Sequence, residues 1–181
     1  MAYCRCYPAA LIPGNELCIV MIFYYRGMIV INKICQVIDG EYVCDIDISV
    51  EEWKALLMNE KVFDSKSIEV LKKWYIEPNH SCTCFDIGKK YEQHSMSANG
   101  VINGLGGRVQ KELGRFEVKG IGNIAPGTKF ITVMKSKETG EKPKRYLWTI
   151  RDELVQAIKE LDFFGSKEIT TNEYYSDDEL I

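Results

Sequence analysis

The stretch SANGVINGLGGRVQKELG, residues 97–114, decides much of the fold, because it combines the apolar spacing of a helix with five glycines. Ile102, Leu105, Val109 and Leu113 recur at helical intervals and predict one buried stripe. A glycine inside a helix costs about 1 kcal/mol relative to alanine. A continuous helix here therefore requires an interaction that offsets this cost, or the segment is broken.

Three of these glycines form a ridge on a helical wheel: Gly100, Gly104 and Gly107, at positions i, i+4 and i+7. A ridge without side chains lets another backbone approach closely. In one interpretation that backbone is DNA, and the polar face of the helix enters or straddles a major groove, where Asn suits adenine and Arg suits guanine. In the other, the ridge packs against the N-terminal sheet and the polar groups face water. The polar face consists of Ser97, Asn99, Asn103, Arg108 and Lys111.

The overall composition is that of an ordinary globular protein of one domain or two small ones. Hydrophobic residues make up 46% of the 181 positions and charged residues 27%, which argues against disorder for most of the chain. The longest apolar run, residues 17–25, is too short to span a bilayer and lacks the flanks of a signal peptide. We therefore expect a cytoplasmic protein without a membrane partner.

The seven cysteines are an odd set, which favours reduced thiols over a secreted disulfide framework. Cys18, Cys35 and Cys44 lie in apolar, strand-like runs and are interpreted as small buried hydrophobic residues. The remaining four form two Cys-x-Cys pairs. These pairs are Cys4 with Cys6 and Cys82 with Cys84.

The second Cys-x-Cys pair lies near the only two histidines, His80 and His94, and therefore raises the question of a metal site. Structural zinc sites usually use two intervening residues between paired cysteines, so this spacing gives a poorer chelate. The histidines also lie in no recognisable nucleophile pattern. We therefore expect no bound metal, no other cofactor and no catalytic activity.

Charge is distributed unevenly behind a net value of −3. Lys and Arg outnumber Asp and Glu by 13 to 6 in residues 86–151, and are outnumbered 9 to 2 in residues 152–181. Concentrated positive charge suits a nucleic-acid backbone, whose counterions are released when cations dock. The alternative is a solvated, lysine-rich hairpin.

The N-terminal part predicts an antiparallel β-meander over residues 15–48. Strand-like runs are separated at Arg26-Gly27 and at Asp39-Gly40, and Asp-Gly between such runs is a strong hairpin signal. The exposed strand edge of a meander makes a dimer a further possibility.

Four helices are expected next, over residues 49–59, 65–77, 82–94 and 97–114. Ser49 with Glu52 has the pattern of a capping box, and Asp64 is placed to cap the second helix. The last two helices, a short one and a longer one joined by a polar turn, resemble a helix-turn-helix. The residues of the short helix expected to face inward are Phe85, Ile87 and Tyr91.

Beyond the long helix, residues 115–123, 128–137 and 144–150 alternate as strands do, and a helix over residues 152–164 follows. A helix-turn-helix followed by a β-hairpin is the winged-helix arrangement. The cations of the hairpin are expected to lie on phosphates and to fix position without reading sequence. These cations are Lys135, Lys137, Lys142, Lys144 and Arg145.

The expected fold class is thus α+β. It comprises an N-terminal antiparallel β-meander (residues 1–48), a winged helix-turn-helix with a C-terminal helix (49–164) and an acidic tail (165–181).

Residues 49–162 resemble a module found beside McrB-type AAA+ and endonuclease parts in bacterial restriction systems. The resemblance is carried by the order of SVEEWKALL, VFDSKSIEVLKKWY, SCTCFDIGKKY, the glycine-containing helix and YLWTIRDELVQAIKEL. It implies a winged-helix-like DNA reader attached to a defence system. The chain carries no Walker motif, no nuclease carboxylate-lysine cluster and no HNH pattern, and the N-terminal meander has no counterpart in that module.

These observations predict a non-catalytic protein of bacterial defence or counter-defence that binds DNA or a nucleoprotein. The alternative is an anti-CRISPR protein that grips a Cas9-type nuclease or its guide complex and blocks DNA binding or cleavage. The acidic end, YYSDDELI, admits three interpretations: a phosphate mimic, a mask for the basic hairpin, or a simple solubilising tail.

Overall fold

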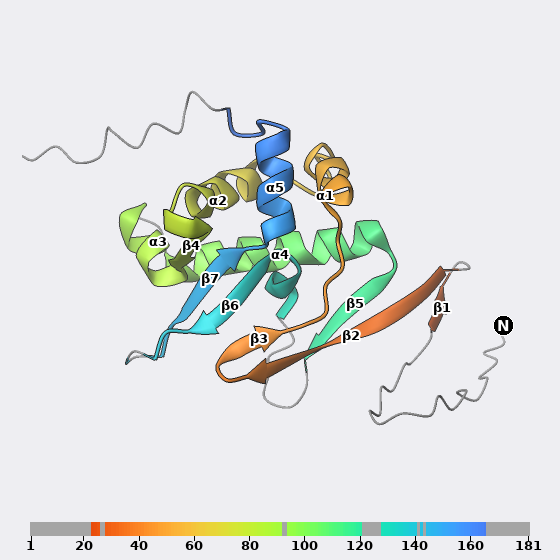
Figure 1. The fold of residues 1–181 in the computed structure, drawn as a ribbon, viewed down its shortest axis with the longest axis horizontal. Helices are drawn as coiled ribbons and strands as arrows, with labels where there is room; N and C mark the ends of the chain where they lie inside the picture. Colours follow the sequence, from red (N-terminus) through yellow and green to blue (C-terminus); the bar gives the residue numbers. More distant parts are fainter. Residues whose placement is uncertain are drawn as a thin grey trace, which may run out of the picture.

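The computed structural model describes residues 23–25, 28–91, 94–120, 128–140, 142 and 144–165 of the chain. In these residues the fold is α+β, as expected, with five α-helices and one seven-stranded sheet (Figure 1). The strands are β1 (Phe23–Tyr25), β2 (Met28–Ile38), β3 (Glu41–Val43), β4 (Ser81–Thr83), β5 (Phe116–Gly120), β6 (Met134–Glu138) and β7 (Tyr146–Ile150).

The sheet is mixed, which corrects the expectation of purely antiparallel strands. An antiparallel path runs β1-β2-β3-β6-β7-β4, and β5 lies parallel to β2. β2 can take this extra neighbour because it is 11 residues long, and its residues 31–35 pair with residues 116–120. β1, β2 and β3 therefore belong to a larger sheet. Residues 15–22, which were also assigned to the meander, lie outside the described residues.

The helices gather on one side of the sheet (Figure 1). Along β6, buried Met134 and Ser136 alternate with exposed Lys135 and Lys137. This two-residue period is typical of a strand with one covered face. The lysines of β6 consequently point away from the core.

The helices are α1 (Val50–Leu57), α2 (Ser65–Tyr75), α3 (Cys84–Lys90), α4 (Ser95–Leu113), α5 (Asp152–Glu160) and the 3₁₀ helices η1 (Pro78–His80) and η2 (Thr128–Thr132). Two of them, α1 and α2, begin directly after the caps predicted for them, Ser49 and Asp64. The capping box of Ser49 and Glu52 is present, and the Asp64 side chain accepts a hydrogen bond from the Ser67 backbone N–H. Both cap predictions are confirmed.

Two elements differ from the sequence-based expectation. Residues 128–132, predicted as the start of a strand, form η2, where buried Phe130 stacks on Trp148 with ring centroids 4.3 Å apart. Residues 82–83, predicted as helix, belong to β4, which pairs with β7. In both places, tertiary pairing overrides a local pattern.

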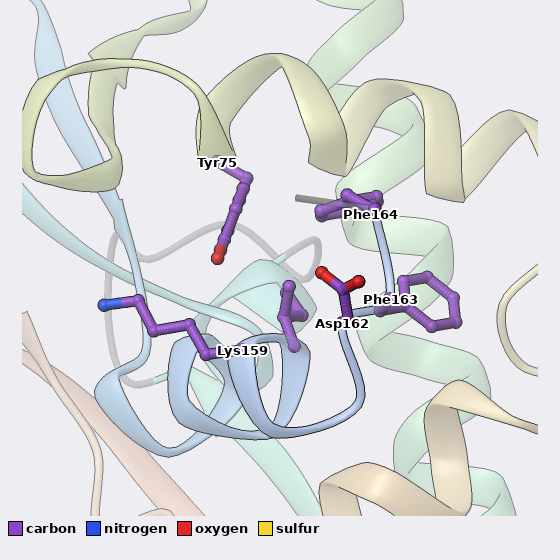
Figure 2. A pocket seen from close by; sticks show the side chains of 7 residues that line it. Tyr75, Lys159, Asp162, Phe163 and Phe164 are labelled. Atoms are coloured by element: carbon purple, nitrogen blue, oxygen red, sulfur yellow. The ribbon is translucent and has the colours of Figure 1, made fainter. Parts of the chain in front are cut away.

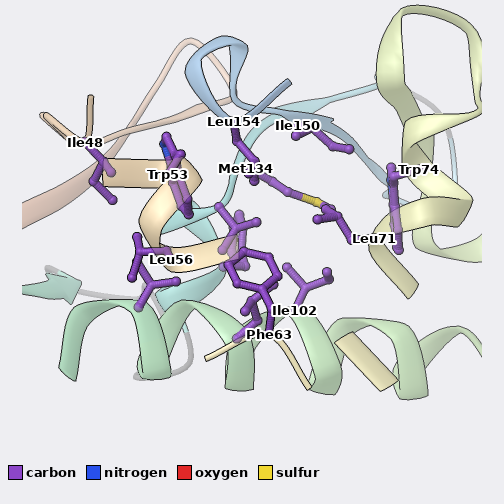
Figure 3. Close-up of a cluster of buried hydrophobic side chains, with 14 of the residues drawn as sticks. Ile48, Trp53, Leu56, Phe63, Leu71, Trp74, Ile102, Met134, Ile150 and Leu154 are labelled. Atoms are coloured by element: carbon purple, nitrogen blue, oxygen red, sulfur yellow. The ribbon is translucent and has the colours of Figure 1, made fainter. Parts of the chain in front are cut away.

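The hydrophobic core lies between the helices and the sheet and includes side chains from α1, α2, α4, β6 and α5 (Figure 3). The expected apolar stripe of α4 is confirmed, because Ile102, Leu105 and Val109 are fully buried. Cys35 from β2 joins this same core. The strands of the predicted segment 1–48 thus share one sheet and one core with the segment 49–164.

The packing of η2 explains one glycine of α4, Gly106. A Cβ added to Gly106 would lie 2.0 Å from the backbone carbonyl oxygen of Lys129, a distance that no side chain can tolerate. The predicted ridge has a close neighbour only at Gly107, where a Cβ would lie 3.3 Å from the Lys129 side chain, since a Cβ at Gly100 meets nothing within 4 Å and one at Gly104 meets only Arg108, at 3.6 Å. The close neighbour is the chain's own backbone at Gly106.

Candidate nucleic-acid interface

Arg108, expected to read guanine, binds within its own chain. Its Nε donates to the Val62 carbonyl oxygen at 2.7 Å, and its Nη2 donates to the Ser67 hydroxyl at 2.5 Å. Its guanidinium also lies 3.3 Å from the Asp64 carboxylate. Because Asp64 caps α2, these contacts tie the middle of α4 to the start of α2.

The two asparagines of the expected reading face also have partners within the chain. The Asn103 amide nitrogen donates to the Asn99 backbone carbonyl at 3.1 Å and to the Asn99 side-chain oxygen at 2.5 Å. Its side-chain oxygen accepts a hydrogen bond from the Phe130 backbone N–H at 3.1 Å. Asn103 thus anchors η2 beside Gly106, and its amide is used for folding.

The rest of the predicted polar face of α4 is exposed. Ser97 and Lys111 face solvent near opposite ends of the helix, and Gly100 and Gly104 lie exposed between them. The five predicted residues therefore fall into an engaged set, whose side chains form hydrogen bonds within the protein, and an exposed set. The engaged residues are Asn99, Asn103 and Arg108, and the exposed ones are Ser97 and Lys111.

Three lysines of the predicted wing pair with carboxylates of the same protein. Lys135 lies 2.5 Å from Asp152, Lys137 lies 2.7 Å from Glu41, and Lys144 lies 2.6 Å from Glu138. All three lysine side chains are at least half exposed. Exposed pairs of this kind contribute little to stability because solvent screens them, so a phosphate can compete for these lysines.

Arg145 places a positive charge over an exposed aromatic ring. Its guanidinium carbon lies 4.0 Å from the centre of the Phe85 ring, and Phe85 remains 48% exposed. The contact brings the start of α3 against the β6–β7 hairpin. Lys89 lies one helical turn after Phe85 and is exposed, so it shares that face of α3.

We call this group the aromatic-basic cluster. It is defined by the contact between Phe85 and Arg145 together with the exposed lysines within four positions of either residue in the chain, which are Lys89, Lys142 and Lys144. Two carboxylates lie near it: Glu138, which pairs with Lys144, and Asp86, which accepts a hydrogen bond from the Thr83 hydroxyl at 2.6 Å. The cluster therefore carries a net positive charge beside an exposed aromatic ring.

Phe85 is exposed, which corrects the prediction that it faces inward from its helix. Ile87 is buried as expected, whereas Phe85 is exposed. Residues two apart in a helix point in nearly opposite directions, so Phe85 and Ile87 cannot both face inward. That spacing was a signal that could have found the exposed ring.

A small pocket of about 280 Å³ lies between α2 and the end of α5. Figure 2 shows Tyr75 of α2 reaching toward the segment that carries Asp162, Phe163 and Phe164. Burial raises the pKa of Tyr75, and the Asp162 carboxylate adds to this effect, so the phenol is protonated at neutral pH. The volume is below that of ordinary ligand sites, about 300–1,000 Å³.

The second Cys-x-Cys pair also has ordinary structural surroundings. Burial raises the pKa of Cys82 to about 11 and that of Cys84 to about 12, so both thiols are protonated and weakly nucleophilic at neutral pH. His80 stacks on Tyr75, and its Nδ1 lies 2.5 Å from the Tyr75 carbonyl oxygen. In the part of the chain that the structure describes, no group of three or more His, Cys, Asp or Glu residues is placed to hold a metal ion.

Comparison with protein-family models, with curated proteins and with solved structures finds no significant match. The resemblance to the module of McrB-type systems therefore stays a prediction. Among the described residues, no helix has the length and apolar character needed to cross a membrane.

Proposed function

We propose that the protein binds nucleic acid without catalysing a reaction, and that the aromatic-basic cluster is its main contact surface. In this proposal α3, α4 and the β6–β7 hairpin act as a winged helix whose wing makes more of the contacts than its long helix. The observation that carries the proposal is the stacking of Arg145 on the half-exposed ring of Phe85.

The chemistry of this pair suits a polynucleotide. A guanidinium that lies over an aromatic ring has its N–H donors in its own plane, above the ring face, from which they can be directed toward phosphate oxygens. An exposed aromatic ring offers a surface on which an unpaired base can stack. Lys142 and Lys144 lie on the same hairpin as Arg145 and add charge for neighbouring phosphates.

The proposal also predicts the kind of recognition. Asn103 and Arg108, the residues best suited to reading base edges, are used inside the fold. Contacts that remain go to phosphates and to base faces, which differ little between sequences. We therefore expect binding with little sequence preference and with strong dependence on salt.

The main test compares two triple variants of the full-length chain. Replacing Lys142, Lys144 and Arg145 with alanine should weaken binding to labelled DNA of any sequence. It should also reduce the slope of log affinity against log salt by about 2–3 for a duplex, because three phosphate contacts are lost. The control replaces Lys61, Lys66 and Lys159, which are exposed elsewhere on the protein, and should leave the slope unchanged. Equal salt slopes for the two variants would contradict the proposal.

A second test isolates the aromatic ring. Phe85→Ala should lower the affinity for single-stranded DNA about tenfold and affect duplex binding less, because only unpaired bases can stack on the ring. Met58→Ala is the control. Met58 caps the C-terminal end of α1, is 71% exposed and does not belong to the aromatic-basic cluster. Equal losses for both variants would contradict a role for stacking.

The setting in bacterial defence rests on the resemblance alone, and the anti-CRISPR alternative gains no support from a described residue. A cleavage assay with a Cas9-type nuclease separates the two functions. Inhibition by a protein that binds neither single-stranded nor duplex DNA would overturn the proposal in favour of the alternative.

A further inference from the structure

Two cysteines lie across from each other at the base of the β2–β3 hairpin. The hairpin register places Ile38 opposite Glu41, Val37 opposite Tyr42 and Gln36 opposite Val43. One further step in this register places Cys35 opposite Cys44. Both thiols are free.

The position of the pair in the ladder favours a cross-strand bond. The turn has two residues, Asp39 and Gly40, both with positive φ, so the first pair after it exchanges hydrogen bonds. Pairs then alternate between the hydrogen-bonded and non-hydrogen-bonded kinds, and the Cys35–Cys44 pair is of the second kind. Opposite Cα atoms in such pairs lie about 4.5 Å apart, within the range of about 4.4–6.8 Å that disulfides span.

The two side chains also share surroundings. Cys35 is fully buried, and Cys44 is half-buried against the same core. The Arg151 guanidinium acts on both thiols, lowering the pKa of each, while the larger effect of burial raises them. Cys35 further raises the pKa of Cys44, as expected of near neighbours.

We propose that Cys35 and Cys44 form a redox modification site that a low-molecular-weight disulfide converts to a cross-strand disulfide. The sulfur of Cys44, the more accessible thiol, attacks one sulfur of the oxidant and releases the first small thiol. The sulfur of Cys35 then attacks the Cys44 sulfur and releases the second. The protein loses two protons and two electrons, and the oxidant is reduced to two thiols.

The bond would close a loop over residues 35–44 and hold β3 at the point where it pairs with β6. Because burial raises the pKa of Cys44 to about 11, little thiolate exists at neutral pH. The thiolate fraction grows about tenfold per pH unit below that value, so oxidation should accelerate about a hundredfold between pH 7 and pH 9. We therefore infer a slowly oxidised site.

The test uses the full-length chain treated with oxidised glutathione at pH 8. Trypsin leaves both cysteines on one peptide, residues 34–54, whereas a double digest with trypsin and a protease that cuts after glutamate separates them at Glu41 and leaves Cys18 on another peptide. We expect the second digest to contain two peptides joined through Cys35 and Cys44, which separate on reduction. Either cysteine joined mainly to a different cysteine, or both still free after other thiols have reacted, would overturn the proposal.

Thermal unfolding gives a second readout. Closing this loop should raise Tm by about 5–10 °C in the oxidised form relative to the reduced form. The shift should vanish in Cys44→Ser and persist in Cys82→Ser, whose thiol is half-buried in a different strand. A shift that survives in Cys44→Ser would overturn the proposal. These readouts do not involve nucleic acid, so they stand or fall independently of the proposed function.

Discussion

Arg108 illustrates, at the scale of one residue, how a cation that looks available for DNA can serve the fold. Its contacts with Val62, Ser67 and Asp64 join α4 to α2. Arg108→Ala should lower the free energy of unfolding by about 1–3 kcal/mol, because it leaves part-buried acceptors without their charged donor. Urea unfolding measures this, with Lys111→Ala as the control.

Lys111 is an exposed cation one helical turn further along α4 and should be replaceable at almost no cost. If Arg108→Ala is as stable as Lys111→Ala, the contacts of Arg108 with α2 and the residues before it contribute nothing to stability. In that case Arg108 returns to the set of residues available for nucleic acid.

A second residue-scale prediction concerns the ion pair between Glu52 and Arg115. The hydrogen bond from Arg115, followed by those from Ser49, lowers the pKa of Glu52 from 4.5 to about 2, against an opposing effect of desolvation. A lowered folded-state pKa means that the stabilisation is complete above about pH 4.5 and is lost as the pH falls toward 2. Both side chains are about one-third exposed, so we expect a loss on the order of 1 kcal/mol.

Urea titrations between pH 5 and 2.5 test this expectation. Arg115→Ala should flatten the fall of stability with decreasing pH. Lys119→Ala, which breaks the exposed pair of Lys119 with Glu117, should leave the fall intact. Parallel pH profiles for Arg115→Ala and the unaltered protein would show that another carboxylate is responsible.

At the scale of elements, the packing of η2 on α4 makes one glycine indispensable and leaves another replaceable. Gly106→Ala would place a methyl group on the Lys129 carbonyl and should destabilise the protein by about 3 kcal/mol or more. Gly100→Ala meets open space in the same helix and should stabilise it by about 0.5–1 kcal/mol. Equilibrium unfolding of the two variants gives opposite signs if η2 packs as described, and matching signs would refute that packing.

The β6–β7 hairpin and α3 are a second case in which two elements make what neither makes alone. Arg145 and Phe85 are 60 positions apart in sequence, and each belongs to a segment with an unremarkable pattern. Their contact arises because β4, which leads into α3, pairs with β7. The cluster is therefore a product of strand pairing.

At the scale of the whole molecule, the uneven charge distribution yields a prediction for the acidic C-terminal residues. Deleting residues 166–181 removes five carboxylates and one lysine. Removing this negative charge should strengthen DNA binding several-fold at low salt, and the gain should fade above about 0.5 M salt because screening shortens the range of the interaction. Residues 166–181 lie outside the described residues, so the prediction rests on charge alone.

Binding curves of the truncated and full-length proteins at three salt concentrations provide the measurement. A gain that persists at high salt would favour a specific mask over general repulsion. Unchanged affinity at all salts would contradict the prediction and leave a solubilising tail as the better interpretation.

Much of the fold followed from local signals. Ser49 with Glu52 and Asp64 marked helix starts, and the turn at Asp39-Gly40 marked the β2–β3 hairpin. Such signals can be recognised in a sequence because the hydrogen bonds of a helix cap or a tight turn join residues within a few positions of each other. The residues of the candidate site were harder to predict. A sequence does not distinguish a cation that stays exposed from one that binds a distant backbone carbonyl.

The α+β class, the caps of α1 and α2, the buried stripe of α4 and the concentration of positive charge in residues 86–151 could all be predicted from residue patterns. The pairing of β5 with β2, the packing of η2 on Gly106 and the set of cations left at the surface depend on the folded arrangement. The difference arises from the separation in sequence of the interacting residues, because helix caps and hydrophobic periods depend on residues that are close in the chain. Val62, which accepts a hydrogen bond from Arg108, is 46 positions away, and Phe130, which donates one to Asn103, is 27 positions away, so only folding brings these residues together.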